Sequence, residues 1–202
     1  MWVHRGVLYI KPGLMAEAIA HAKTVSVPEG EHGRMLRPIN GPEAMTQLIV
    51  ESEFEDIDAA FASHGRPGPV DDDWWRRWLE LNQNRGCYEL YQVLHTVSGD
   101  GPPGLWVDRR VRFCPRARLG EALDLWRALP PSPIPGYSLR VLLPRTSSER
   151  TQPLVVECTA ASLTEWELEL AKDSPGAAEW VRKLHACEEE GYPIVDLLRV
   201  VE

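Results

Sequence analysis

Apolar and polar positions alternate along the chain in a way that predicts a short series of strands and helices. Residues 2–10 are β-branched and aromatic with a period of two, which is typical of a strand. Leu14, Ala18 and Ile19 then recur at helical spacing through about Lys23. We predict further strands at 34–39, 46–52 and 88–94, a helix that starts at Ile57 behind Asp56 as its N-cap, and a helix over 74–84.

The same series occurs a second time. Residues 2–9 match residues 106–113 at an offset of 104, and 48–51 match 154–157 at an offset of 106. Trp75 and Gly86 match Trp180 and Gly191 at 105, and 89–94 resemble 196–201 at 107. Because these matches keep one order and nearly one offset, the sequence indicates an internal repeat.

Each repeat therefore predicts the order β-α-β-β-α-β, with its second helix broken in two. This is the ferredoxin-like order of an α+β fold. Its helices cover one sheet face, and an apolar second face must also be covered. We expect two tandem units, 1–94 and 105–202, packed sheet to sheet as an intramolecular α/β barrel. The Gly, Pro, Ser and Asp residues of 95–104 predict the linker.

A strand followed by Lys11-Pro12-Gly13 and an amphipathic helix, then a strand that reaches Glu51 and a Trp-bearing helix behind the acidic residues 71–73, resembles the dimeric α/β-barrel superfamily. The pattern is similar to its antibiotic-biosynthesis-monooxygenase and NIPSNAP-type members. The resemblance implies two ferredoxin-like units around a pocket, and it matches no catalytic motif. The second repeat departs from it, with Pro115-Arg116-Ala117 in place of the first turn.

Composition narrows the classes of function. The 202 residues carry a net charge of −8, which disfavours a nucleic-acid partner. No apolar run reaches the roughly 20 residues that span a bilayer, and the N-terminal residues do not resemble a signal peptide. The four cysteines are widely spaced, and no nucleotide-binding or metal motif occurs. We expect a cytoplasmic protein with no metal and no cofactor, which binds neither nucleic acid nor membrane.

Four polar residues of the two repeated first strands are candidates for the pocket. They alternate with Val3, Val7, Val107 and Val111, and successive strand residues point to opposite faces. If the valines meet the helices, the polar side chains line the space between the sheets and favour an anionic ligand. The alternative is that they lie at exposed strand ends. These candidates are His4, Asp108, Arg110 and Arg112.

Glu51 and Glu157 occupy matching positions, each after an apolar stretch. Either carboxylate serves as a base if burial raises its pKa, or it pairs with the repeated Arg5 or Arg109. We favour the ion pair because both repeats keep both residues. Tyr91 is a further pocket candidate that would contribute a hydroxyl group.

Trp75 and Trp180 recur at helical spacing, so we expect core anchors rather than a surface that stacks a planar ligand.

The sequence leaves two functions open. One is a cofactor-independent, monooxygenase-like enzyme, and the other is a non-catalytic ligand-binding or sensory protein. A weaker third interpretation is a heme-binding barrel that uses His185. The expected partner is an anionic or aromatic small molecule, and the chain is a monomer with an internal pseudo-dimer, or a homodimer.

Overall fold

The computed structural model of the 202-residue chain is an α+β fold with two compact units. Unit 1 comprises Met1–Tyr91 and Leu198–Glu202, and unit 2 comprises Gln92–Leu197. The structure describes residues 1–24, 32–41, 44–59, 72–129, 132–145, 151–170, 172, 176–188 and 194–201.

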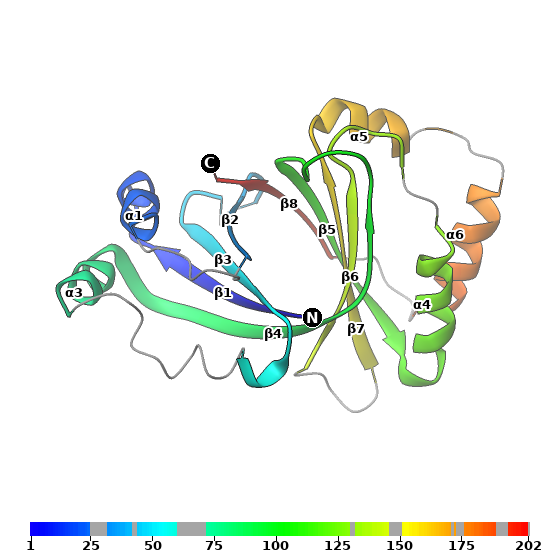
Figure 1. Cartoon of the computed structure of the whole chain (residues 1–202), viewed down its shortest axis with the longest axis horizontal. Coiled ribbons are helices and arrows are strands. Elements are labelled where there is room, and N and C mark those ends of the chain that lie inside the picture. Colours follow the sequence, from blue (N-terminus) through cyan, green and yellow to red (C-terminus); the bar gives the residue numbers. More distant parts are fainter. Residues whose placement is uncertain are drawn as a thin grey trace. The chain divides into compact units, whose positions relative to one another are not determined.

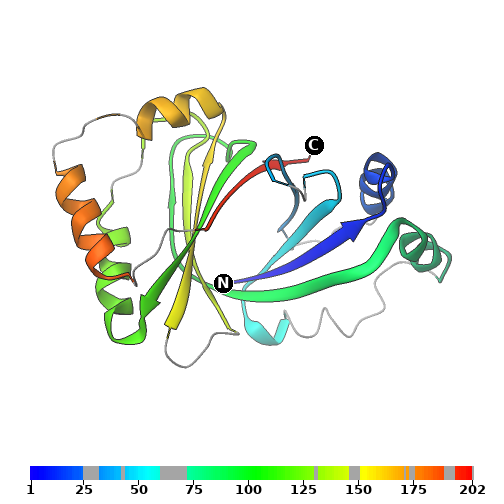
Figure 2. The same cartoon turned by 180° about the vertical axis from the view of Figure 1, so that it is seen from behind.

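Unit 1 is built on antiparallel strands with helices on one side (Figure 1). Strand β3 pairs with β1 on one edge and with β2 on the other. Helices α1 and α3 lie side by side (Figures 1 and 2). Its elements are β1 (Trp2–Ile10), α1 (Met15–Ala22), β2 (His32–Pro38), β3 (Gln47–Phe54), α3 (Asp72–Leu81) and the first part of β4 (Asn82–Ser98).

The helices of unit 1 cover the even-numbered side of β1. Ile10 and Leu48 pack with Met15 and Ala18 of α1, and with Trp78 of α3, in one apolar cluster. Burial of these side chains fixes both helices to the sheet, since each fully buried large apolar side chain contributes about 1.5–3 kcal/mol. The odd-numbered side of β1 is therefore the side without helices.

Unit 2 has the same kind of sheet. Strand β7 pairs antiparallel with β5 and with β6. Cys114 of β5 packs with Ala122 of α4 and Leu184 of α6, so the even-numbered side of β5 meets the helices. Its elements are β5 (Trp106–Pro115), a 3-10 turn (Arg116–Arg118), α4 (Leu119–Arg127), β6 (Ser138–Pro144), β7 (Thr151–Ala160), α5 (Leu163–Leu170), α6 (Ala177–Ala186) and β8 (Ile194–Val200).

Strands β4 and β8 each continue from one unit into the other. In unit 1, the end of β8 pairs with β2, where Leu36 faces Val200. The hydrogen-bonded strand order is closed, β1-β3-β2-β8-β5-β7-β6-β4, which is the topology of an eight-stranded barrel. The predicted class and strand number are thus present in the structure.

Several local predictions are confirmed and others are corrected. The backbone N–H of Ala59 donates to Asp56 Oδ1 at 2.7 Å, so the predicted cap is present, and the N–H of Glu165 donates to Ser162 Oγ at 3.3 Å in the same way. Helix α3 ends at Leu81, earlier than predicted, because Asn82 begins β4. Strand β4 runs to Ser98, so residues 95–98 of the expected linker belong to a strand.

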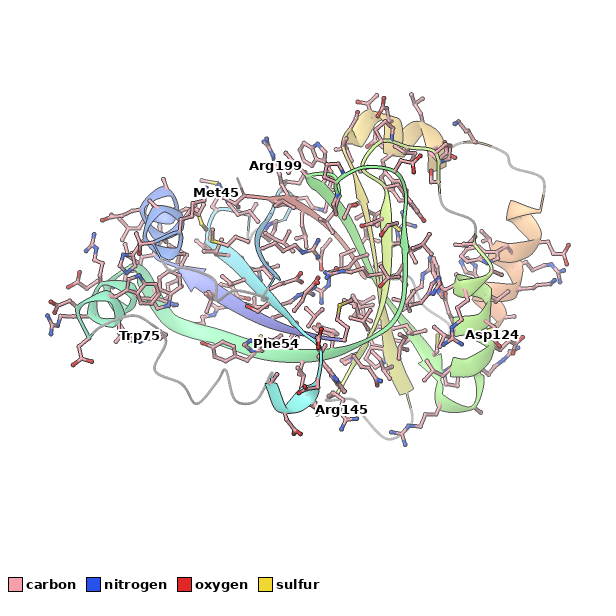
Figure 3. The ribbon with its side chains drawn as sticks, viewed as in Figure 1. Met45, Phe54, Trp75, Asp124, Arg145 and Arg199 are labelled. Atoms are coloured by element: carbon pink, nitrogen blue, oxygen red, sulfur yellow. The ribbon has the colours of Figure 1, made fainter. Side chains whose placement is uncertain are left out.

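Trp75 is not the core anchor that the repeat predicts. Its side chain is 44% exposed, whereas Trp78 is 8% exposed. Figure 3 shows the position of Trp75 on α3. Trp74, Trp78 and Leu81 follow the i, i+4, i+7 spacing of the face that meets the sheet, which leaves Trp75 outside it.

Candidate functional site

A buried carboxylate in unit 1 is held between two arginines on neighbouring strands. The register places Arg5 of β1 and Arg34 of β2 opposite Glu51 of β3. Arg5 Nε donates to Glu51 Oε1 at 2.6 Å, and its Nη2 contacts the same oxygen. Arg34 Nε donates to Glu51 Oε2 at 2.6 Å. We call Arg5, Arg34 and Glu51 the unit 1 ion cluster.

Unit 2 contains the matching arrangement at the repeat offsets. Arg109 of β5 and Arg140 of β6 stand opposite Glu157 of β7. Arg140 Nη2 donates to Glu157 Oε2 at 2.6 Å, and Arg109 Nε lies 3.8 Å from Glu157 Oε1. Arg109 Nη1 also lies 3.4 Å from Asp196 Oδ2. The expected Glu–Arg pairs are therefore both present, and each carboxylate has a second arginine that the sequence analysis missed.

The ion clusters lie on the side of each sheet that carries no helix. Arg5 alternates with Leu8 and Ile10 of the helix side, and shares its side with Val3 and Val7. Arg34 and Glu51 belong to this side by their register with Arg5. Buried charges are tolerated where they are paired, so the two carboxylates allow Arg5 and Arg109 to lie within the sheets beside apolar residues such as Val3 and Val107.

Tyr91 extends the unit 1 ion cluster. The guanidinium carbon of Arg5 lies 5.0 Å from the centre of the Tyr91 ring, within the range of a cation–π contact. The Tyr91 hydroxyl donates to Glu89 Oε2 at 2.7 Å. Tyr91 is only 3% exposed, so its hydroxyl is held in a defined position. That Tyr91, Glu51 and Glu157 line a pocket stays a prediction.

The expected orientation of His4, Asp108, Arg110 and Arg112 is wrong. Asp108 accepts a hydrogen bond of 2.9 Å from the Trp166 indole of α5, so this side of β5 faces the helices. His4 lies on the corresponding side of β1 and stacks on Tyr88, with ring centres 5.3 Å apart.

Partners within unit 2 explain why charged residues lie on the helix side. Arg112 Nη1 donates to both oxygens of Glu188, at 2.6 and 2.9 Å, just beyond α6. Arg110 donates to Asp108 through Nε and Nη2, with the shortest bond at 2.8 Å. A polar side of a strand therefore packs under helices because each charge meets an opposite charge there.

The Asp108 environment also changes the acidity of its neighbours. The hydrogen bond to Asp108 raises the pKa of Arg110, so this guanidinium stays charged. Burial, and then the charge of Asp108, raise the pKa of the Cys158 thiol to about 12. Burial also raises the pKa of Tyr137. Cys158 is therefore a neutral thiol at physiological pH, and it lacks the thiolate form that nucleophilic chemistry needs.

The heme interpretation concerns His185 and stays a prediction. His185 is exposed near the C-terminal end of α6. Within the described part of the chain, no group of three or more His, Cys, Asp or Glu residues is arranged to hold a metal ion. In the same residues, no helix has the length and apolar character needed to cross a membrane.

Three residues of the site were missed from the sequence, namely Arg34, Arg140 and Glu89. A signal existed for the arginines, because Arg34 and Arg140 are related by the same offset of 106 as Glu51 and Glu157. Glu89 lies two residues before Tyr91 and so shares its strand side, which the alternation alone predicts.

No protein-family model and no curated protein matches the chain. Solved structures do match. An anthrone oxidase-like protein has a TM-score of 0.66 at 15% identity, with 100% of this chain and 91% of that chain covered. A candidate monooxygenase from Lactobacillus acidophilus has a TM-score of 0.69 at 12% identity, covering 98% and 93%. One from Fusobacterium nucleatum has a TM-score of 0.68 at 7% identity, covering 100% and 92%.

These likenesses concern the fold. At such low identities, the shared architecture supports a ferredoxin-like barrel fold of the kind adopted by structures named as monooxygenases. The comparisons thus support the fold, and the activity has to be argued from the side chains.

Proposed function

We propose that the chain binds a planar organic molecule with a carboxylate or phenolic group on the helix-free sheet side of unit 1, and oxidises such a molecule as a cofactor-independent, monooxygenase-like enzyme. In this proposal the chain consists of two tandem ferredoxin-like units, works in the cytoplasm, and closes its barrel as a monomer with an internal pseudo-dimer. The observation that carries it is the unit 1 ion cluster with Tyr91, on the sheet side that carries no helix.

Small-molecule sites are mostly apolar and contain a few precisely placed polar groups. Val3, Val7, Leu36 and Ile49 supply the apolar surroundings in unit 1. Arg34 donates to Glu51 through its Nε. Its side chain is 20% exposed, so Arg34 is the arginine best placed to meet an anion that arrives from solvent.

The architecture supports oxidation as the reaction, because the similar structures include an anthrone oxidase-like protein and two candidate monooxygenases. We therefore choose anthrone as the test substrate. Its aerobic oxidation, anthrone + O₂ → anthraquinone + H₂O, takes one oxygen atom into the new carbonyl group and releases the other as water. Dioxygen is the oxidant.

A non-catalytic ligand-binding protein is the second candidate. The observation in its favour is that Glu51 and Glu157 each accept hydrogen bonds or ion pairs from arginines on both sides. These carboxylates are engaged in holding guanidinium groups, which is a structural role.

The first experiment is calorimetric titration of the full chain with 2-naphthoate and with the neutral, matched 2-naphthamide. We expect Arg34→Gln to weaken 2-naphthoate binding at least about tenfold, the effect of losing one charge-assisted contact, and to leave 2-naphthamide binding unchanged. Arg76→Gln is the control, because that side chain is 69% exposed on α3. Equal weakening by both variants, or no binding by the wild type, contradicts the proposal.

The second experiment measures oxygen uptake and anthraquinone formation from anthrone in air. Formation above the rate in buffer supports the enzyme. Binding of 2-naphthoate without any oxidation of anthrone favours the non-catalytic alternative. A visible absorption band in the purified protein would instead point to heme.

A further inference from the structure

The two units differ in how they use the acidic residue that the repeat places at matching positions, Glu89 in β4 and Asp196 in β8. In unit 2, Asp196 lies 3.4 Å from Arg109 and so adds to an ion pair. In unit 1, Glu89 accepts a hydrogen bond from the Tyr91 hydroxyl. The position that matches Tyr91 is Leu198, which has no hydroxyl.

This difference divides the residues of the site into a group that both units share and a group that only unit 1 has. The Arg–Glu–Arg arrangement occurs in both units, which is expected of a structural framework. The Tyr91–Glu89 hydrogen bond has no counterpart at the matching positions, which is expected of a group that serves one ligand. The Arg5 guanidinium over the Tyr91 ring connects the two groups of residues, because it fixes the ring that carries the hydroxyl.

The geometry also suits proton transfer. A tyrosine hydroxyl has one donor hydrogen and lone pairs that accept. The hydrogen points to Glu89 Oε2 at 2.7 Å, which is the alignment that proton transfer from the hydroxyl to the carboxylate needs. Glu89 is less buried than Tyr91, so its carboxylate connects the buried hydroxyl with water for the transfer of a proton.

We propose that Tyr91 and Glu89 form a proton-transfer pair for the ligand of unit 1, with Tyr91 as the group that touches the ligand and Glu89 as its positioning and exchange partner. This inference rests on the proposed function, since it concerns the same site. The Tyr91 oxygen takes a proton from an acidic C–H or O–H of the ligand, while the Tyr91 proton passes to the Glu89 carboxylate. The ligand keeps the electron pair as an anion, Glu89 becomes neutral, and no oxidant takes part in this step.

The test measures proton exchange without oxidation. Anthrone is incubated with the full chain in D₂O under strictly anaerobic conditions, and loss of the C10–H signal is followed by NMR. We expect the wild type to accelerate exchange above the buffer rate. Tyr91→Phe keeps the ring under Arg5 and removes only the hydroxyl, so we expect it to lower the enzymatic rate about 100-fold, in the range of general acid–base catalysis.

Glu89→Gln tests the exchange partner. We expect a similar loss of rate at neutral pH, and a pH–rate profile whose acid limb differs from that of the wild type, which a merely structural role would not change. Asp196→Asn is the matched control, since it alters the corresponding carboxylate in unit 2 and we expect wild-type exchange. Calorimetry with 2-naphthoate shows that each variant still binds.

The outcomes distinguish the two proposals. Exchange that Tyr91→Phe retains in full overturns the proton-transfer pair and leaves the proposed binding and oxidation in place. Aerobic oxidation of anthrone by a wild type that does not accelerate exchange also overturns the proton-transfer pair and leaves the proposed oxidation in place. Loss of exchange in Tyr91→Phe and Glu89→Gln, with 2-naphthoate binding and Asp196→Asn unaffected, supports the pair. A wild type that neither binds 2-naphthoate nor changes anthrone overturns both.

Discussion

The indole Nε1 of Trp166 donates a hydrogen bond of 2.9 Å to Oδ2 of Asp108. The contact joins α5 to β5 in unit 2, and both side chains are buried. A buried carboxylate is stable only when hydrogen bonds or opposite charges replace its water. The Trp166–Asp108 bond therefore both satisfies Asp108 and fixes the position of α5.

Replacement of Trp166 by Phe should lower the free energy of unfolding by about 1.5–3 kcal/mol, because a hydrogen bond to a charged group is lost. Urea denaturation followed by circular dichroism measures this change. Leu168→Ala on the same helix is the control, since Leu168 is 62% exposed and surface changes stay within about 0.5 kcal/mol. Equal stability of Trp166→Phe and the wild type would show that the bond contributes nothing.

The unit 1 ion cluster should respond differently to single and double replacement. Glu51→Leu leaves buried arginines without their carboxylate and should cost about 3–5 kcal/mol. The double variant Arg5→Met/Glu51→Leu should regain the part of that loss that the unpaired Arg5 causes, because apolar groups then fill its space, while Arg34 is 20% exposed and still reaches water. Denaturant titration of all three proteins checks this. A double variant that is less stable than Glu51→Leu contradicts the interpretation that Arg5 needs its partner.

The two tryptophans of α3 should differ in their contribution to stability. Trp78→Ala removes a buried side chain from the apolar cluster and should cost about 3–5 kcal/mol. Trp75→Ala loses mainly the edge contact with the Trp74 ring and should cost about 0.5–1.5 kcal/mol. Thermal and urea unfolding measure both values. The opposite ranking would mean that α3 meets the sheet through another face.

Cys158 should resist alkylation in the folded protein. Burial and Asp108 raise the pKa of its thiol to about 12, whereas Cys87 is exposed. Iodoacetamide at pH 8, followed by peptide mass spectrometry, should therefore label Cys87 and leave Cys158 unlabelled until the protein is denatured. Rapid labelling of Cys158 in the native protein would contradict the raised pKa of its thiol.

The same thiol should make stability depend on alkaline pH. In the unfolded chain a thiol ionises near pH 8.5, while the folded state keeps its proton up to about pH 12. Between these values the folded state binds more protons than the unfolded state, so the free energy of unfolding falls as pH rises. Cys158→Ala should show a smaller decline between about pH 9 and pH 12, as measured by urea titration at each pH.

Periodicity predicted the strands well and their faces poorly. Strand β1 spans the predicted residues 2–10 because β-branched and aromatic residues favour an extended chain whatever lies above or below it. Which side meets the helices depends on partners that are distant in sequence. Arg5 is buried because Glu51 lies on the next strand, and Asp108 is buried because Trp166 follows on α5. The alternation of apolar and polar residues within a strand does not reveal either of these distant partners.

The limits of β4 and the role of Trp75 illustrate the same point. Asn82–Asn84 have the polarity of a helix end, yet they begin β4, in which the side chain of Gln83 donates to the carbonyl of Ile10. Trp75 has the residue type of a core position, but the phase of α3 is set by Trp74, Trp78 and Leu81 together. Tertiary contacts therefore decide the secondary structure and the burial of residues whose local sequence is compatible with more than one outcome.

The continuation of β8 into unit 1 has a consequence for biosynthesis. Leu198 and Val200 pair with β2, although Tyr91 ends the earlier part of unit 1 in the chain. While the ribosome is still translating the residues of unit 2, β2 lacks this neighbour and presents unpaired backbone groups at a sheet edge. The first unit to be synthesised is thus completed only after the second has been translated, and a nascent chain that stalls in between would display an edge that chaperones bind.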